Sequence, residues 1–141
     1  MRGVPVGVGF ALVALALAGC GGGAQTLEAA DGTQVFVGRS ESDGDDALLE
    51  GPLAVLDGCL GAVEQVVVWP NGTKVVDDDP LTVTVPGNRG ELRVGDQVRL
   101  GGGVALEPAP SSVAAEPLEV AGVTVPAMCA GHGVWMASPA N

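Results

Sequence analysis

The sequence predicts an all-β domain, a small closed barrel of the OB type with six to eight short strands, or alternatively a β-sandwich. Three observations lead to this class. Short β-branched runs recur between turn residues, several segments alternate apolar and polar residues, and no long stretch has helical periodicity. A closed barrel removes the free edges of an open sheet, and the shortness of the strands favours it over the sandwich.

The first half of the domain contains two expected hairpins. A strand is expected at residues 34–37, and the Asp57-Gly58 turn separates strands at 52–56 and 59–63. Residues 66–69, Val-Val-Val-Trp, have no polar alternation, so this strand is expected to be buried on both faces. After the Asn71-Gly72 turn, residues 74–76 are expected to return antiparallel to it.

The second half contains weaker strand signals. Residues 81–85 alternate as a half-buried strand, and the Gly95-Asp96 turn leads into a strand that the glycines at 101–103 are expected to end. Residues 105–117 are rich in Pro and Ala and are expected to form an irregular surface excursion. Short strands are expected within 120–125 and at 134–136, with a loop at 128–133 between them.

The N-terminal segment predicts export and lipid anchoring. Arg2 precedes a short apolar run that ends in Leu17-Ala18-Gly19-Cys20, and this motif resembles the lipobox of bacterial lipoprotein precursors. The resemblance implies cleavage before Cys20, acylation of its thiol, and anchoring on the extracytoplasmic face of the cell membrane. The expected organisation is a signal peptide at 1–19, a flexible tether at 20–32 and one β domain at 33–137.

The composition excludes some classes of partner. The formal net charge is −11, which argues against nucleic acid and against direct contact between the domain and anionic lipid. Aromatic residues make up 3% of the chain, too few for a stacking platform. We expect contact with the membrane through the lipid on Cys20, no nucleic acid and no cofactor, while the envelope protein or small-molecule partner stays open.

Two cysteines remain once Cys20 is acylated. Outside the cytoplasm, Cys59 and Cys129 are expected to form a disulfide that closes a loop of about 70 residues. The alternative is thiol or metal chemistry, in which Cys59, Cys129 and His132 hold zinc or a Cys-His pair acts as a nucleophile oriented by Asp57. No recognisable catalytic signature surrounds either cysteine, so we expect a domain that is not an enzyme.

Acidic loops offer a further alternative. Asp43, Asp45 and Asp46, and separately residues 77–79, could supply oxygen ligands to calcium, although the first cluster lacks the EF-hand register. We predict no metal site and read both clusters as solvated loops.

An ordered series of short motifs carries a second resemblance. These are Gly-Cys-Leu at 58–60, Val-Val-Trp-Pro at 67–70, residues 94–103, Cys129, and Val-Trp at 134–135. The series resembles a small domain of unknown function found in predicted lipoproteins and exported proteins of Gram-positive bacteria, and it implies a β domain with a Cys-Cys link. The residues expected to be structural are Trp69, Trp135, Gly95, Asp96, Gly101, Gly102 and Gly103. The sequence therefore predicts a lipid-anchored binding or accessory module of the cell envelope.

Overall fold

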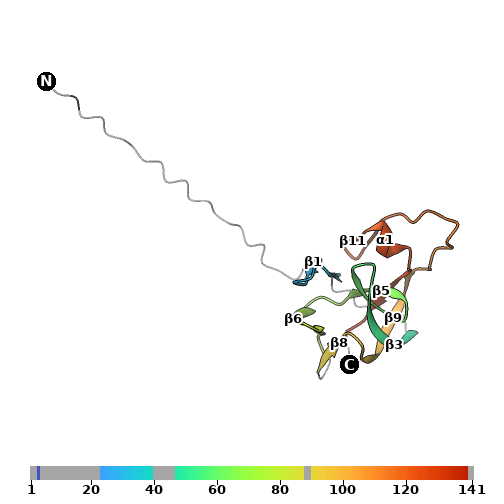
Figure 1. The fold of residues 1–141 in the computed structure, drawn as a ribbon, viewed down its shortest axis with the longest axis horizontal. Coiled ribbons are helices and arrows are strands. Elements are labelled where there is room, and N and C mark those ends of the chain that lie inside the picture. Colours follow the sequence, from blue (N-terminus) through green and yellow to red (C-terminus); the bar gives the residue numbers. More distant parts are fainter. Residues whose placement is uncertain (1–2, 4–22, 40–46, 88–89, 140–141) are drawn as a thin grey trace.

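The structure is a computed structural model, and it describes residues 3, 23–39, 47–87 and 90–139. It confirms the all-β class, because strands dominate these residues and the one helix, α1 (Ala127–Ala130), is a single turn (Figure 1). The strands are β1 (Gln25–Glu28), β2 (Gln34–Val37), β3 (Ala47–Leu56), β4 (Cys59–Ala62), β5 (Gln65–Trp69), β6 (Lys74–Asp78), β7 (Leu81–Thr84), β8 (Glu91–Arg93), β9 (Gln97–Leu106), β10 (Leu118–Val120), β11 (Val123–Val125) and β12 (Val134–Ala137).

Seven strands form the main sheet, in the order β1-β2-β4-β3-β9-β12-β5, with additional pairings of β5 to β2 and to β4. The pairings can thus be followed from β4 through β3, β9, β12 and β5 back to β4. All neighbours on this path are antiparallel except β5 and β12, which pair in parallel with Val66 opposite Val134. A small sheet, β10-β11, and a three-stranded sheet, β6-β7-β8, complete the fold.

The alternation of side chains along the strands builds two apolar clusters. One face of β4, β5, β9 and β12 contributes Leu60, Trp69, Leu100 and Trp135 to the larger cluster, which we call the inner core. The three-stranded sheet packs on it through residues of β7 and the turn that follows. Burial of this cluster is the main source of stability.

The opposite face of β5 is also covered. Val66 and Val68 pack with Phe36 of β2, with Val123 and Val125 of β11, and with residues of α1, in a second cluster that we call the outer core. The expected burial of residues 66–69 on both faces is confirmed, because all four are at most 2% exposed. A strand with this sequence needs two apolar layers, and β11 with α1 supplies the second.

Three expectations about the strands are wrong. Gln25–Glu28, expected in the flexible tether, pair with β2 as β1. Gly101–Gly103, expected to end a strand, lie inside β9, which continues to Leu106 and shortens the excursion expected from residue 105. The segment after Asn71-Gly72 pairs with β7 instead of β5. β5 already pairs with β4, β12 and β2, so it has no free edge for β6.

The turn between β6–β8 and the main sheet follows the prediction for Gly95-Asp96. Gly95 has a φ of 102°, and Asp96 Oδ2 accepts a hydrogen bond of 3.0 Å from the Arg93 backbone N–H. On the other side, Leu53 N–H donates to Asp96 O and Gly95 N–H donates to Leu53 O, both at 2.8 Å. This turn therefore connects the three-stranded sheet to β3.

Two hairpin turns of the main sheet contain residues with left-handed backbone conformations, and the two turns differ in how well their residue types suit this conformation. Asp57 and Gly58 have φ values of 47° and 81°, and this residue pair suits a tight turn. Val63 and Glu64 have φ values of 52° and 64° between β4 and β5, where side chains with a Cβ are disfavoured. Val63 packs on the inner core, whereas Glu64 is exposed. A substitution at Glu64 can therefore remove the backbone strain of this turn without disturbing the core.

We expect Glu64→Gly to raise the free energy of unfolding by about 0.5–1 kcal/mol, because glycine adopts this conformation without a steric cost. The matched change is Gly58→Ala, which should lower it by about 1 kcal/mol, since no atom lies within 4 Å of the added Cβ and only the φ of 81° opposes it. Urea unfolding at unchanged m-value measures both. A Glu64→Gly midpoint below that of the wild type would contradict the expectation.

Candidate functional site: the disulfide and its surroundings

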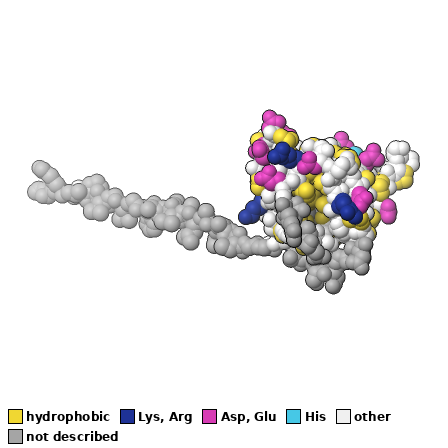
Figure 2. All heavy atoms as spheres, turned by 90° about the horizontal axis from the view of Figure 1, so that it is seen from below, with side chains coloured by type: hydrophobic (Ala, Val, Ile, Leu, Met, Phe, Trp, Pro, Cys, Tyr) yellow, Lys and Arg dark blue, Asp and Glu magenta, His cyan; other side chains and the backbone are white. Residues whose placement is uncertain are grey.

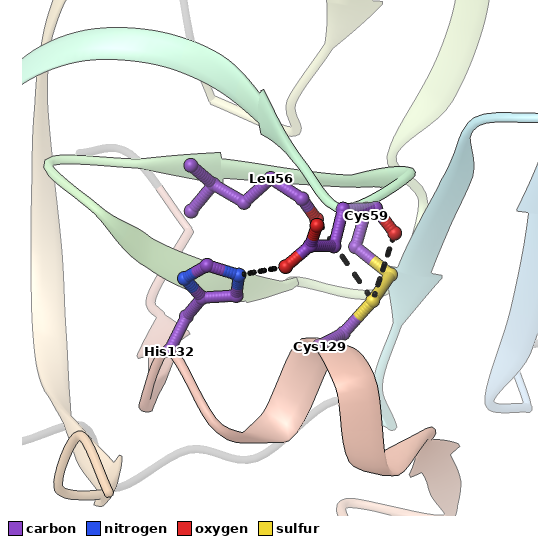
Figure 3. Close-up of polar contacts among 5 residues, drawn as sticks. Leu56, Cys59, Cys129 and His132 are labelled. Atoms are coloured by element: carbon purple, nitrogen blue, oxygen red, sulfur yellow. Dashed lines mark hydrogen bonds and ion pairs between the residues drawn. A yellow bond between two sulfur atoms is a disulfide. The ribbon is translucent and has the colours of Figure 1, made fainter. Parts of the chain in front are cut away.

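The predicted disulfide is confirmed. Cys59 opens β4 directly after the Asp57-Gly58 turn, and Cys129 lies on α1, with 6.2 Å between the two Cα atoms. Both cysteines are at most 1% exposed within the outer core. Figure 3 shows the bond between the β3–β4 hairpin and α1. Cys129 Sγ lies 3.7 Å from Asp57 O, a packing contact because a disulfide sulfur has no hydrogen to donate.

A histidine-carboxylate pair lies beside the disulfide. His132 Nε2 is 2.6 Å from Asp57 Oδ2, and Figure 3 shows the imidazole directed at this carboxylate. The backbone positions His132, because its N–H donates to Cys129 O at 3.1 Å and Gly133 N–H donates to Ala130 O at 2.9 Å. The sequence hypothesis that Asp57 orients His132 therefore matches the geometry. Its nucleophile is missing in this structure, since Cys129 is oxidised and has no thiolate to offer.

We expect this pair to contribute at most about 1 kcal/mol to stability, because its side chains are 32% and 61% exposed and solvent screens the interaction. A double-mutant cycle with Asp57→Asn and His132→Gln, read by urea unfolding at pH 6, measures the coupling free energy. A coupling of about 3 kcal/mol would contradict this expectation, since it is the size found for pairs that are buried.

The outer core determines which sheet surface stays open. Val66 and Val68 of β5, Cys59 of β4 and Val134 of β12 all face it. β11 and α1 cover them, and β2, which pairs with β4 and β5 in the same sheet, adds Phe36. The disulfide fastens α1 to this surface. Any ligand must therefore bind elsewhere, unless β11 and α1 move away.

The other predicted structural residues lie apart from this end. Trp69 and Trp135 are 0% and 4% exposed in the inner core, and their indole N–H groups have no acceptor among the described residues. Gly102 has a φ of 143°, and a Cβ built on it would lie 1.8 Å from Met136 O, whereas a Cβ on Gly101 would meet nothing within 4 Å. Gly103 is buried opposite Met136 in the β9–β12 ladder. The triple glycine thus contains a close contact at Gly102.

Sequence reasoning missed Gly61, another glycine of this kind. A Cβ on Gly61 of β4 would lie 2.2 Å from the Gln65 carbonyl oxygen. Nothing local distinguishes Gly61 from the other glycines, because its neighbour is defined by the pairing of β4 with β5.

No group of three or more His, Cys, Asp or Glu side chains able to hold a metal ion occurs among the described residues. Asp77 and Asp78 end β6, where Asp78 Oδ1 accepts a hydrogen bond from Ala30 N–H at 2.9 Å. The acidic cluster at Asp43, Asp45 and Asp46 lies outside the described residues, as do Cys20 and the predicted signal peptide apart from residue 3. Within the described part of the chain, no helix has the length and apolarity to span a bilayer.

Comparison with known proteins adds no assignment: no protein-family model, no curated protein and no solved structure matches the chain. The resemblances drawn from the lipobox and from the motif series therefore stay predictions.

Proposed function

We propose that this chain is a lipid-anchored, extracytoplasmic module built on an OB-like barrel, and that it binds or assists another component of the cell envelope. The strand order supports the barrel. In chain order, the five strands of the closed path are β3, β4, β5, β9 and β12, and around the path they follow as first, second, third, fifth and fourth. That order, with the third and fifth strands parallel, is consistent with a five-stranded OB-like barrel and supports the proposal.

The disulfide between the two cysteines is the main observation in favour of an extracytoplasmic location. A buried disulfide between Cys59 and Cys129 is a bond of oxidising compartments, so it supports export of the chain. It also leaves Cys20, at the end of the lipobox, as the one cysteine of three that this disulfide does not use. A diacylated Cys20 thiol would give stable anchoring, because each buried methylene contributes about 0.8 kcal/mol.

Two features argue against the usual ligands of OB-folds. These folds bind oligonucleotides and oligosaccharides on the outer face of their second and third strands, which here correspond to β4 and β5. That face is covered by β11 and α1. The net charge of −11 opposes polyanions, and Figure 2 shows acidic side chains spread over the face in view. A protein or small-molecule partner at another surface fits these features better.

The test is the intact mass of the protein purified from membranes, measured with and without reductant and alkylating reagent. The proposal expects a mature chain that starts at an acylated Cys20 and takes up alkyl groups at Cys59 and Cys129 only after reduction. The matched control is Cys20→Ser, which should abolish acylation and release the protein from the membrane fraction while the disulfide persists.

Two results would overturn the proposal. A wild-type chain without acyl groups would remove the anchor. Alkylation of Cys59 and Cys129 without reductant would remove the disulfide, and would favour thiol or metal chemistry with His132.

A further inference from the structure

We propose that the domain is held above the bilayer in one fixed orientation, with the end where the chain enters the fold toward the lipid headgroups and the disulfide end, formed by the Asp57-Gly58 turn, α1 and His132, facing away. The inference rests on the proposed acylation of Cys20, and it concerns a different property, the surface that faces the lipid.

The entry of the chain into the fold is fixed by contacts. Asn71 Nδ2, in the turn between β5 and β6, donates to Gly23 O at 3.3 Å. Ala24 lies against the β10–β11 turn, because its Cβ would be 3.0 Å from a Cβ built on Gly122. Arg39 N–H, after β2, donates to Ala121 O of the same turn at 2.9 Å. We call these residues, Gly23, Arg39, Asn71, Ala121 and Gly122, the entry end.

The free tether that remains is short. Only three residue steps separate Cys20 from Gly23, so they reach at most about 10 Å. A domain of this size has a radius of gyration of about 13 Å. The tether is therefore too short for the domain to turn over above the bilayer, and the entry end must stay near the headgroups.

The strands lead from the entry end to the disulfide end. β2 starts beside the Asp57-Gly58 turn, where Gln34 N–H donates to Gly58 O at 2.8 Å, and it ends at the entry end. β1 begins at the entry end and leads to the Asp31-Gly32 turn, where Ala30 contacts Asp78. The disulfide and the Asp57–His132 pair consequently lie at the end of the domain away from the lipid.

The exposed charges differ between the entry end and the disulfide end. Two cations, Arg39 and Lys74, are exposed at or beside the entry end, with one exposed acid, Glu119, two residues before Ala121. The disulfide end carries the exposed carboxylates Asp31, Asp57 and Asp78. The Thr33 backbone N–H and then the Thr33 side chain lower the pKa of Asp31, which favours its charged form. Anionic headgroups repel the domain as a whole, because the net charge of the chain is −11, and they repel the acidic disulfide end more than the end that carries Arg39 and Lys74. The proposal depends on the path of the chain, and the charge adds to it.

The test uses the full lipidated protein in vesicles that carry a quencher on the lipid headgroup. An introduced cysteine is the one free thiol of the mature chain and takes a fluorophore. We compare Gln25→Cys at the start of β1, Ala30→Cys at the other end of the same hairpin, and Val113→Cys in the excursion, which lies across the domain from β1 (Figure 1). All three positions are exposed.

The expected result is quenching several-fold stronger at Gln25→Cys than at Ala30→Cys and Val113→Cys. Inserting about twelve Gly and Ser residues after Gly22 should abolish the difference, because a flexible linker of that length reaches roughly 20 Å. Equal quenching at the three positions with the native tether would overturn the fixed orientation, provided that the intact mass shows the acyl groups. Absence of the acyl groups would instead overturn the proposed function.

Discussion

Replacing Cys59 and Cys129 together with alanine is expected to lower the free energy of unfolding by about 4 kcal/mol. The disulfide closes a loop with a sequence separation of 70 residues, and removing it restores the conformational entropy of that loop to the unfolded chain. Domains of this size are stable by about 5–15 kcal/mol, so the loss is a large fraction of the total. The outer core, which depends on α1 being held against β4, is expected to loosen first.

Chemical denaturation of the mature domain measures this loss. Wild-type protein in reductant should approach the double variant, whereas the double variant should unfold at the same midpoint with and without reductant. A wild-type midpoint that reductant leaves unchanged, after alkylation has shown that the bond is broken, would contradict the expectation. The single variants are avoided because each leaves a buried free thiol.

Gly102→Ala is expected to destabilise the protein by roughly 3 kcal/mol or more. The added Cβ would overlap the Met136 carbonyl oxygen of β12 and would meet the indole nitrogen of Trp135, and the φ of 143° adds strain. Backbone cannot move aside as the end of a flexible side chain does, so the β9–β12 ladder itself must shift.

Gly101→Ala is the matched control. It lies one residue away in the same strand, its Cβ meets nothing within 4 Å, and it has no left-handed φ. We expect it to be neutral or to stabilise by up to about 1 kcal/mol, because alanine loses less entropy on folding than glycine. Thermal unfolding of the two variants side by side checks the pair, and equal losses would show that Gly102 has no special contact.

Local sequence patterns predicted most of the strands. The runs at residues 34–37, 66–69 and 134–136 are short, apolar and bounded by turn residues, and the structure has β2, β5 and β12 there. Two of the wrong expectations share a cause, because the pairing of β5 and the continuation of β9 through Gly101–Gly103 depend on partner strands distant in the sequence. Gln25–Glu28 pair instead with the neighbouring strand β2, and their mostly polar sequence did not indicate a strand.

The candidate site was predictable in its covalent part only. Three cysteines, with one at a lipobox, leave one pair for a disulfide, so Cys59 and Cys129 followed from counting. The contact of His132 with Asp57 joins residues 75 apart, and the sequence offered it as one hypothesis among several. The sequence could not predict that β11 covers the β4–β5 face. The apolar residues of β11 indicate that this strand is buried, but they do not indicate which surface it packs against.

The parallel pairing of β5 with β12 also bears on how the protein folds. It joins residues 66–68 to residues 134–136, and β3 pairs with β9 across a similar distance in the sequence. A topology with so many distant contacts folds in milliseconds to seconds, because each long loop must close before its contacts stabilise it. β12 is synthesised after the other six strands of the main sheet, and until it arrives β9 has an unpaired edge open to other chains. Chains that end before Val134 should therefore aggregate instead of folding more loosely. Trp69 and Trp135 lie one on each of the two parallel strands, so their fluorescence emission should change when the sheet is completed.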